Sequence, residues 1–364
     1  MVNRIYYCQF LLSSHINFTM THLADHSQGL SHDAVNHLLR RDKLTGRILW
    51  EHVQGDIVQS PRGCLVFDDS VLNKEHSHAI ELVRLQYSGN EHGLVNCLYV
   101  NPDTGQYWIV DYRIFNPEGD GKRKLDHVQQ MLTLAIADKA LSFTHVLFDS
   151  WYATKDMMLF AESMGRFYYC PLKSNLQVDE SASVLSYRRV DALLWDAVEQ
   201  ERGKTIKIRG FPRDHKVKFL RVVVSTNRTD WIVTNDLAQD CMQGTQQACA
   251  LRWKIEHFHR ELKQVTGVEK CQCRKARIKR DHIACTVLVW VRLTAIARKS
   301  GNTTTRLKNL VIGLPAQGTA QSVCFYGFCV IPNFFSAVPP QWRGAFSEFV
   351  PVVKLGLPSL IFRF

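Results

Sequence analysis

Acidic residues follow two of the apolar segments that we expect to be strands. Asp68 and Asp69 come directly after the segment 64–67, and Asp149 comes directly after the segment 144–148. In mixed α/β sheets, ligands bind beside the carboxyl ends of the strands, where carboxylates of neighbouring strands can share a divalent cation. A single aspartate after a strand is usually a turn or cap residue. Because the arrangement occurs twice, the sequence favours a metal site.

A third carboxylate lies in a stretch with helical periodicity at about 243–264. Four charged or polar residues recur there at spacings of four, three and four: Arg252, Glu256, His259 and Lys263. They share one face of the predicted helix. Four apolar residues are expected to bury the other side: Trp253, Ile255, Phe258 and Leu262. An exposed helix with salt bridges between turns would give the same pattern, but Glu256 completes a set of three carboxylates.

The charge of the chain favours a polyanionic partner. The 364 residues include 45 Lys and Arg against 34 Asp and Glu, a formal net charge of +11, and the length suggests two or three domains. Residues 252 to 280 alone hold ten Lys or Arg against three Glu. Contacts between cations and phosphates release counterions and strengthen binding. A basic stretch beside Glu256 therefore indicates a DNA-binding track rather than a merely solvated surface.

Residues 21–41 have the pattern of a helix-turn-helix. Leu23 and Ala24 form a first apolar pair, Gly29 suits the turn, and Ser31 is placed to cap a second helix. In a DNA-binding version, the second helix would enter the major groove. Four residues would then contact bases and phosphates: His32, Asn36, Arg40 and Arg41. An ordinary helical hairpin would show the same pattern.

The sequence between these regions predicts an α/β fold with a mixed sheet covered by helices. The expected strands are 64–67, 94–100, 107–115, 144–148 and 166–172, with helices at about 124–140 and 154–164. Residues 173–240 interrupt the alternation as a β-rich insertion, with strands at 205–208, 218–225 and 230–235. Helices are expected again at 243–264 and 281–298.

Other features of the sequence argue against four alternative classes: a secreted protein with disulfides, a structural zinc protein, a membrane protein and a Walker-type nucleotide-binding protein. Eleven cysteines, an odd number, fit free thiols in a reducing compartment such as the cytoplasm. Cys271 and Cys273 have no second pair at zinc-finger spacing, which disfavours structural zinc. Residues 318–342 carry no charge, but their prolines and glycine would break a membrane-spanning helix. A Gly-rich nucleotide loop of the Walker type is absent from the sequence.

Together, these residues resemble the DDE transposases of bacterial insertion sequences, in the group marked by a Tyr-x2-Arg-x3-Glu-x6-Lys signature. Arg252, Glu256 and Lys263 match its last three positions, and the segments FDDS (67–70) and FDSWY (148–152) match those with the first and second catalytic aspartates. The resemblance covers about residues 20–300. It implies a ribonuclease H-like core with a β-rich insertion before the glutamate.

The resemblance also implies the site residues. Asp69, Asp149 and Glu256 would be catalytic and would hold the metal ions, with Asp68 as the alternative to Asp69, which directly precedes the Ser/Thr position of the family pattern. Arg252 and Lys263 would contact DNA. Three carboxylates suit Mg²⁺, with Mn²⁺ as the alternative, and two such ions would serve both attacking and leaving oxygens in strand transfer.

The partners expected for such a protein are double-stranded DNA, both the terminal repeats of the element and the target, and a second copy of the chain on paired ends. No membrane is expected, and the protein would be cytoplasmic, associated with the nucleoid when bound to DNA. The expected domains are a helical DNA-binding domain (1–60), the two parts of the core (61–172 and 241–310), the insertion (173–240) and an irregular tail (311–364).

The sequence departs from the family pattern at two places. Cys249 stands where the signature has tyrosine, and the tail lacks the helical, charged ending expected of the family. Two alternatives therefore accompany an active transposase. One is a DNA-binding remnant without transfer activity, and the other is a ribonuclease H-like nuclease without transposition.

Overall fold

The computed structural model describes residues 4–14, 18–27, 29–41, 44–73, 81–86, 89–181, 186–225 and 228–313. The chain forms two compact units. One unit comprises Ile57–Ser70 and Gly93–His257, and the other comprises the described residues before Ile57, within Val71–His92 and from Phe258 onward. The uncharged stretch 318–342 and the predicted tail beyond residue 313 lie outside the described residues.

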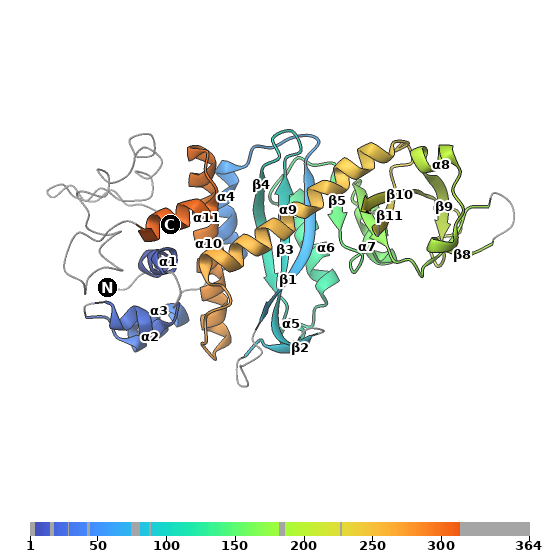
Figure 1. Cartoon of the computed structure of the whole chain (residues 1–364). Coiled ribbons are helices and arrows are strands. Elements are labelled where there is room, and N and C mark those ends of the chain that lie inside the picture. Colours follow the sequence, from blue (N-terminus) through green and yellow to red (C-terminus); the bar gives the residue numbers. More distant parts are fainter. Residues whose placement is uncertain are drawn as a thin grey trace. The chain divides into compact units, whose positions relative to one another are not determined.

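A mixed sheet forms the centre of the first of these units (Figure 1). Its core strands are β1 (Cys64–Asn73), β3 (Gly89–Val100), β4 (Tyr107–Ile114), β5 (His145–Phe148) and β6 (Phe167–Leu172). β5 pairs in parallel with both β1 and β6, and β4 pairs antiparallel with β3. The strand order is β3-β1-β5-β6, with β4 on β3. The predicted mixed α/β sheet is confirmed.

Helices connect the strands of this sheet. The short α5 (Pro117–Asp120) and the longer α6 (Lys124–Ala137) lead from β4 to β5, and α7 (Lys155–Ser163) leads from β5 to β6. Parallel neighbours such as β5 and β6 require a crossover of this kind. Leu65, Val66 and Phe67 of β1 are fully buried. A run of apolar residues, rather than an alternation, is typical of a strand covered on both faces.

The segment expected to be a β-rich insertion continues the same sheet. Its elements are β7 (Gln177–Asp179), β8 (Arg188–Arg189), η2 (Val190–Ala192), α8 (Ala197–Arg202), β9 (Lys204–Ile208), β10 (Val217–Ser225) and β11 (Arg228–Thr234). β11 pairs antiparallel with β6, with Trp231 opposite Leu172. From β6 the order continues β11-β10-β9-β7-β8. The segment is therefore hydrogen-bonded to the core strands.

The other unit is mainly helical. Its helices are α1 (Arg4–Ser13), α2 (Met20–Asp25), α3 (His32–Arg41), α4 (Gly46–Val53), η1 (Gln54–Asp56), α10 (Ala276–Ser300) and α11 (Thr304–Gly313), together with the last residues of α9 (Met242–Thr266). α1, α3, α4 and α11 all pack on α10. Tyr7 and His282 join α1 to α10 through a hydrogen bond of 2.8 Å. A short strand, β2 (Arg84–Gln86), pairs with the first residues of β3.

The two helices predicted within residues 21–41 are present as α2 and α3. Ser31 Oγ accepts a hydrogen bond of 3.1 Å from the backbone N–H of Ala34, as expected of an N-cap residue. Gly29 between the helices has a φ of 71°, which glycine adopts without steric cost. No helix among the described residues is long and apolar enough to cross a membrane.

The expected end of the first strand is wrong. β1 continues to Asn73, so Asp68 and Asp69 lie inside the strand and not after it. The strand continues because the segment after the acids still alternates, with Ser70 and Leu72 buried. Successive side chains of a strand point to opposite faces. Asp68 and Asp69 therefore face different environments, which decides their roles.

The expected burial of Trp253 is also wrong. Ile255, Phe258 and Leu262 of α9 are buried as expected, but Trp253 is 45% exposed. Residues two apart on a helix are separated by about 200°, so Trp253 lies on the side opposite Ile255. The basic stretch 252–280 is not one continuous surface either. α9 ends at Thr266, α10 begins at Ala276, and Lys279 is buried with its ammonium group bonded to the carbonyl oxygen of Cys271.

Candidate active site

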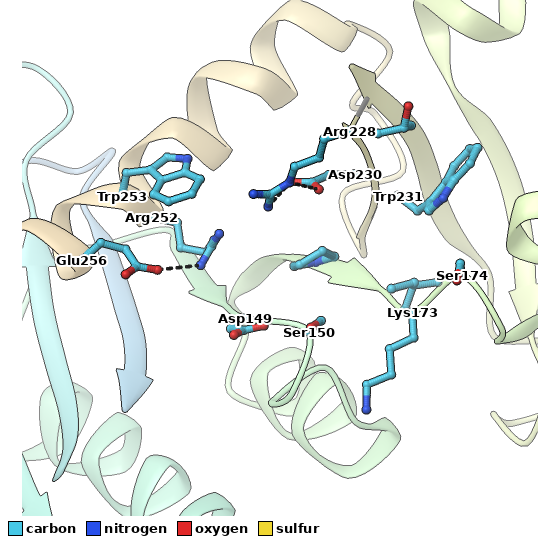
Figure 2. Close-up of a pocket in the computed structure, with 13 residues that line it drawn as sticks. Asp149, Ser150, Lys173, Ser174, Arg228, Asp230, Trp231, Arg252, Trp253 and Glu256 are labelled. Carbon is cyan, nitrogen blue, oxygen red and sulfur yellow. Dashed lines mark hydrogen bonds and ion pairs between the residues drawn. The ribbon is translucent and has the colours of Figure 1, made fainter. Parts of the chain in front are cut away.

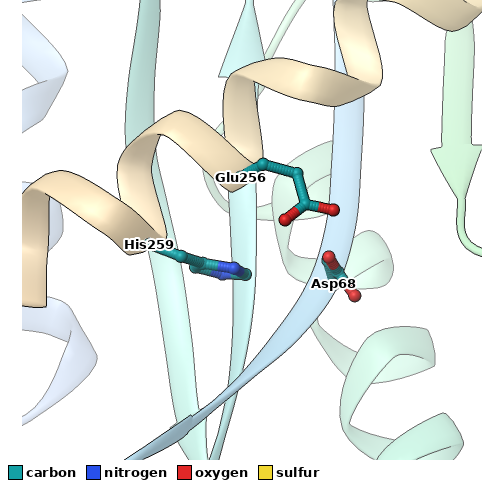
Figure 3. Close-up of side chains that lie close together, drawn as sticks. All are labelled: Asp68, Glu256 and His259. Carbon is teal, nitrogen blue, oxygen red and sulfur yellow. The ribbon is translucent and has the colours of Figure 1, made fainter.

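Asp68 and Glu256 bring two carboxylates together. Asp68 lies on β1 and Glu256 on α9, and a carboxylate oxygen of one lies within 4.8 Å of a carboxylate oxygen of the other (Figure 3). His259, three residues after Glu256, lies on the same side of α9. Asp68 Oδ1 also accepts a hydrogen bond of 2.8 Å from the backbone N–H of Asp69.

The environment of Asp68 disfavours its negative charge. Burial, together with the charges of Asp69, Asp149 and Glu256, raises the pKa of Asp68 to about 7, although the hydrogen bond from the Asp69 N–H acts in the opposite direction. Desolvation and nearby like charges both disfavour an ionised carboxyl group. A divalent cation among these oxygens would remove both penalties, so the residues fit a metal ion of the hard type.

Asp69 points to the other face of β1 and is fully engaged there. Lys124 Nζ, at the start of α6, lies 2.5 Å from Asp69 Oδ2. The hydroxyl of Tyr152 donates a hydrogen bond of 2.9 Å to Asp69 Oδ1. The structure thus brings Asp68, and not Asp69, to Glu256. Asp69 was the first choice from the sequence, and Asp68 was the alternative.

Asp149 directly follows β5, as expected from the sequence. One of its carboxylate oxygens accepts a hydrogen bond of 3.2 Å from the backbone N–H of Trp151. Asp149 and Glu256 line the same pocket, which has a volume of about 450 Å³ (Figure 2). The pocket is lined further by Ser150, Lys173, Arg228, Asp230, Arg252 and Trp253. The two carboxylates thus face an open space in which a substrate can lie.

Two arginines border the carboxylates in this pocket. Arg252 Nη1 lies 3.8 Å from Glu256 Oε1, and Arg228 pairs with both carboxylate oxygens of Asp230 at 2.9 and 3.1 Å. Both guanidinium groups lie over the ring of Trp253, at 5.0 Å for Arg252 and 5.7 Å for Arg228. Cations beside acidic groups and an exposed aromatic ring suit a phosphodiester with its base.

Lys263 and Cys249 depart from the expected arrangement. Lys263 Nζ donates a hydrogen bond of 2.7 Å to the carbonyl oxygen of Val71 and lies 3.2 Å from Glu269 Oε1. The ammonium group is thus engaged by protein atoms. Cys249, at the position of the signature tyrosine, lines a second cavity of about 150 Å³ beside Arg252. Burial raises the pKa of its thiol to about 12, so it is not a reactive thiolate at neutral pH.

The residues predicted to read DNA bases lie on α3. His32, Arg40 and Arg41 are exposed, and Asn36 is half-buried. The Asn36 amide lies 3.0 Å from Nδ1 of His32, one turn earlier. An exposed polar row of this kind is compatible with insertion into a groove but is also common on surface helices.

Several residues of the site were missed by the sequence analysis. Tyr152 could have been found, because it belongs to the same FDSWY segment as Asp149. No sequence motif pointed to Lys124, because 55 residues separate it from Asp69. Arg228 and Asp230 lie on β11, where a charged pair on a strand resembles ordinary surface.

A comparison with known protein families shows which family the chain belongs to. Residues 59–291, well over half of the chain, match the family described as the transposase DDE domain. The chain therefore belongs to the DDE transposase family. It is a DNA transposase, an enzyme of the polynucleotidyl transferase and nuclease class, and enzymes of this family use divalent metal ions.

The other comparisons give less information about the function of the chain. Residues 312–363 match a family of proteins of unknown function. The chain is similar to a solved structure, the cryo-EM structure of piggyBac transposase synaptic complex with hairpin DNA, with 10% identity and a TM-score of 0.42, over 98% of this chain and 77% of that chain. No curated protein matches the sequence.

Proposed function

We propose that this transposase cleaves and joins DNA at the ends of an insertion sequence with divalent ions held by Asp68, Asp149 and Glu256. The observation that supports the proposal most is the approach of the Asp68 and Glu256 carboxylates within 4.8 Å. Asp149 and Glu256 line one pocket, so Asp149, the third acid, lies in the same site as Glu256. Asp68 replaces Asp69 in this proposal because Asp69 is engaged by Lys124 and Tyr152.

The carboxylate oxygens of Asp68, Asp149 and Glu256 favour Mg²⁺, with Mn²⁺ as the alternative. Bound ions of this kind supply an activated water or 3′ hydroxyl and stabilise the leaving oxygen in phosphodiester transfer. The protein groups hold the substrate. Arg252 and Arg228 would bind the phosphates next to the scissile bond, while the Trp253 ring supports both guanidinium groups. We do not extend this role to Lys263, whose contacts with Val71 and Glu269 favour a structural task.

We propose further that the sheet is the ribonuclease H-like core of the family, continued by the β-rich segment 173–240. The β3–β4 hairpin, the parallel neighbours β1, β5 and β6, and the acids on β1 and after β5 support this assignment. The proposed domain bounds stay at 1–60, 61–172, 173–240, 241–310 and 311–364.

We propose that α3 reads the terminal repeats through His32, Asn36, Arg40 and Arg41, as the second helix of a helix-turn-helix. Because two element ends must be brought together, the working form on double-stranded DNA is a homodimer. The expected compartment is the cytoplasm, at the nucleoid. A DNA-binding remnant and a nuclease without transposition are not favoured, since the chain belongs to a transposase family.

The test is a cleavage and strand-transfer assay on DNA with the repeats that flank the gene. Activity is expected with Mg²⁺ or Mn²⁺ and should vanish with a chelator. Asp68→Asn and Glu256→Gln should each abolish cleavage. Asp191→Asn, which removes an exposed acid paired with Arg189, serves as the control and should act like the wild type. Full cleavage by Asp68→Asn would contradict the proposed ligand set.

A further inference from the structure

We propose that Tyr152, Asp69 and Lys124 form a bridge that fixes the spacing between Asp68 and Asp149, and that they are positioning residues of the metal site. The inference rests on the proposed function, in which Asp68 and Asp149 both hold divalent ions. The inference assigns a role to Asp69, the second acid of β1, whose side chain does not face Glu256.

The bridge begins at the Asp69 backbone. Its N–H donates a hydrogen bond of 2.8 Å to Asp68 Oδ1, so the conformation of Asp69 sets the direction of the Asp68 carboxylate. The Asp69 side chain is held at both oxygens, by the Tyr152 hydroxyl at 2.9 Å and by Lys124 Nζ at 2.5 Å. With both of its oxygens engaged, Asp69 has little freedom to rotate, and the backbone beside Asp68 is fixed with it.

The other end of the bridge is the loop with Asp149. Tyr152 follows Asp149 by three residues, and its backbone N–H donates a hydrogen bond of 3.1 Å to the carbonyl oxygen of Asp149. The Trp151 N–H bonds to the Asp149 carboxylate in the same turn. The Tyr152 side chain is fully buried. Asp149 therefore cannot shift without moving Tyr152, whose hydroxyl is attached to β1 through Asp69.

Lys124 makes the anchoring of Asp69 rigid. Its ammonium group lies 5.5 Å from the centre of the Phe115 ring and 5.3 Å from that of Trp151, and its side chain is only 13% exposed. A cation held between two rings contributes more to positioning than one on a freely rotating stem. The carboxylate is thus oriented by a charge-assisted hydrogen bond, which is about twice as strong as a neutral one.

Groups that orient metal ligands without touching the metal set its affinity, and their loss typically weakens binding about 10–100-fold. We therefore expect Tyr152→Phe, which removes only the hydroxyl, to weaken Mn²⁺ binding by a factor in this range. Asp69→Asn should also weaken it. Because both substitutions break one bridge, the double variant should be little worse than the worse single variant.

The experiment measures free Mn²⁺ by electron paramagnetic resonance during titration of the full chain. Tyr99→Phe is the matched control, since the buried Tyr99 hydroxyl also makes hydrogen bonds, with Ser60 and Ser142, away from the acids. It should bind Mn²⁺ like the wild type. Hydrogen exchange of the metal-free protein gives a second readout, and the amides of residues 149–154 should exchange faster in Tyr152→Phe but not in the control.

A third readout separates positioning from catalysis. Nicking by Tyr152→Phe should recover to the wild-type maximal rate at high Mn²⁺, because only the apparent affinity for the metal is changed. A lowered maximal rate at saturating Mn²⁺ would overturn the inference, and so would Mn²⁺ binding by Tyr152→Phe equal to that of Tyr99→Phe. Complete loss of binding in Asp69→Asn would also overturn it, because Asp69 would then be a ligand itself.

The reference variant is Asp68→Asn. If it binds Mn²⁺ like the wild type, the proposed ligand set fails. If it loses binding while Tyr152→Phe does not, only the bridge fails.

Discussion

Arg292 on α10 donates a hydrogen bond of 3.1 Å from its guanidinium group to Nδ1 of His52 on α4. An acceptor nitrogen must lack a proton, so this contact requires a neutral imidazole. Burial, with the charges of Arg292 and Arg4, lowers the pKa of His52 from 6.5 to about 4.

This contact predicts acid sensitivity of the helical unit. Between pH 6.5 and 4 the unfolded chain binds a proton at His52 and the folded chain does not, so stability is present above pH 6.5 and falls as the pH is lowered. The loss should be about 1 kcal/mol, because solvent screens a half-exposed group. His52→Gln, which keeps an acceptor for Arg292, should flatten the dependence in thermal unfolding followed by circular dichroism. The exposed His37→Gln is the control, and an equal flattening there would refute the assignment.

Asp68→Asn should have opposite effects on stability with and without metal. In the metal-free protein the folded pKa of Asp68, about 7, lies above its ordinary 3.8. Stability is therefore lost as the pH rises through 7, and Asp68→Asn should raise the unfolding free energy at pH 8 by about 1–3 kcal/mol. With Mn²⁺ at about 100 times its Kd, the wild type should gain about 2.7 kcal/mol, and the variant should not. Thermal unfolding in chelator and in Mn²⁺ measures both, and a gain by the variant in Mn²⁺ would count against the site.

Arg228→Gln should weaken DNA binding alike for all sequences. If its guanidinium contacts one phosphate, the slope of log K against log salt should fall by about 0.9. Arg189→Gln, which removes a paired, exposed arginine of the same β-rich segment, is the control and should leave the slope unchanged. Fluorescence anisotropy at several salt concentrations gives the slopes, and equal slopes for Arg228→Gln and the wild type would exclude a phosphate contact.

Lys263→Met should act on stability more than on DNA binding. Its loss leaves the Val71 carbonyl oxygen and Glu269 without their cation, which should cost about 1–2 kcal/mol of unfolding free energy. Urea denaturation measures this cost, and the salt dependence of DNA binding should stay within error of the wild type. A reduction of the slope by one unit with unchanged stability would restore the phosphate contact expected from the sequence.

Recognition of the element ends should depend on α3. Removal of residues 1–55 is not a clean test, because α1, α3 and α4 all pack on α10 and their loss would expose its apolar side. Asn36→Ala and Arg40→Ala change the partly or fully exposed side chains only. Each should lower the preference for end-bearing over arbitrary DNA by about 1–3 kcal/mol, with nicking of arbitrary DNA unchanged. Competition footprinting measures the preference, with Arg47→Ala as the control.

The sequence predicted the elements well where the apolar pattern is strong. The runs at 144–148 and 166–172 are strands, and the periodic stretch with Glu256 is a helix. The prediction from the sequence was wrong where turn propensity and strand pattern favoured different structures. Two consecutive aspartates are typical of a turn, yet β1 continues through them, because the residues after them still alternate between buried and more exposed positions. A helical wheel would have placed Trp253 on the open side, opposite Ile255.

The choice between Asp68 and Asp69 could not be made from the sequence. It depends on which face of β1 each side chain takes, and thus on where the strand begins and ends. The partners of Asp69 lie 55 and 83 residues away, at Lys124 and Tyr152. Contacts over such separations follow from the packing of α6 and of the loop after β5 and leave no local pattern.

The two consecutive aspartates of β1, Asp68 and Asp69, also affect the register that the strand takes in the sheet. Residues 64–67 are buried on both faces, so sliding the strand by one position would exchange one apolar side chain for another and cost little burial. A slip by one position in either direction would, however, leave the place of one of the two acids without a carboxylate. Phe67 would take the place of Asp68, or Ser70 would take the place of Asp69 beside Lys124. The ion pair with Lys124, together with the proposed metal ligand on the opposite face of the sheet, thus selects one register for a strand that its apolar run alone would leave free to slip.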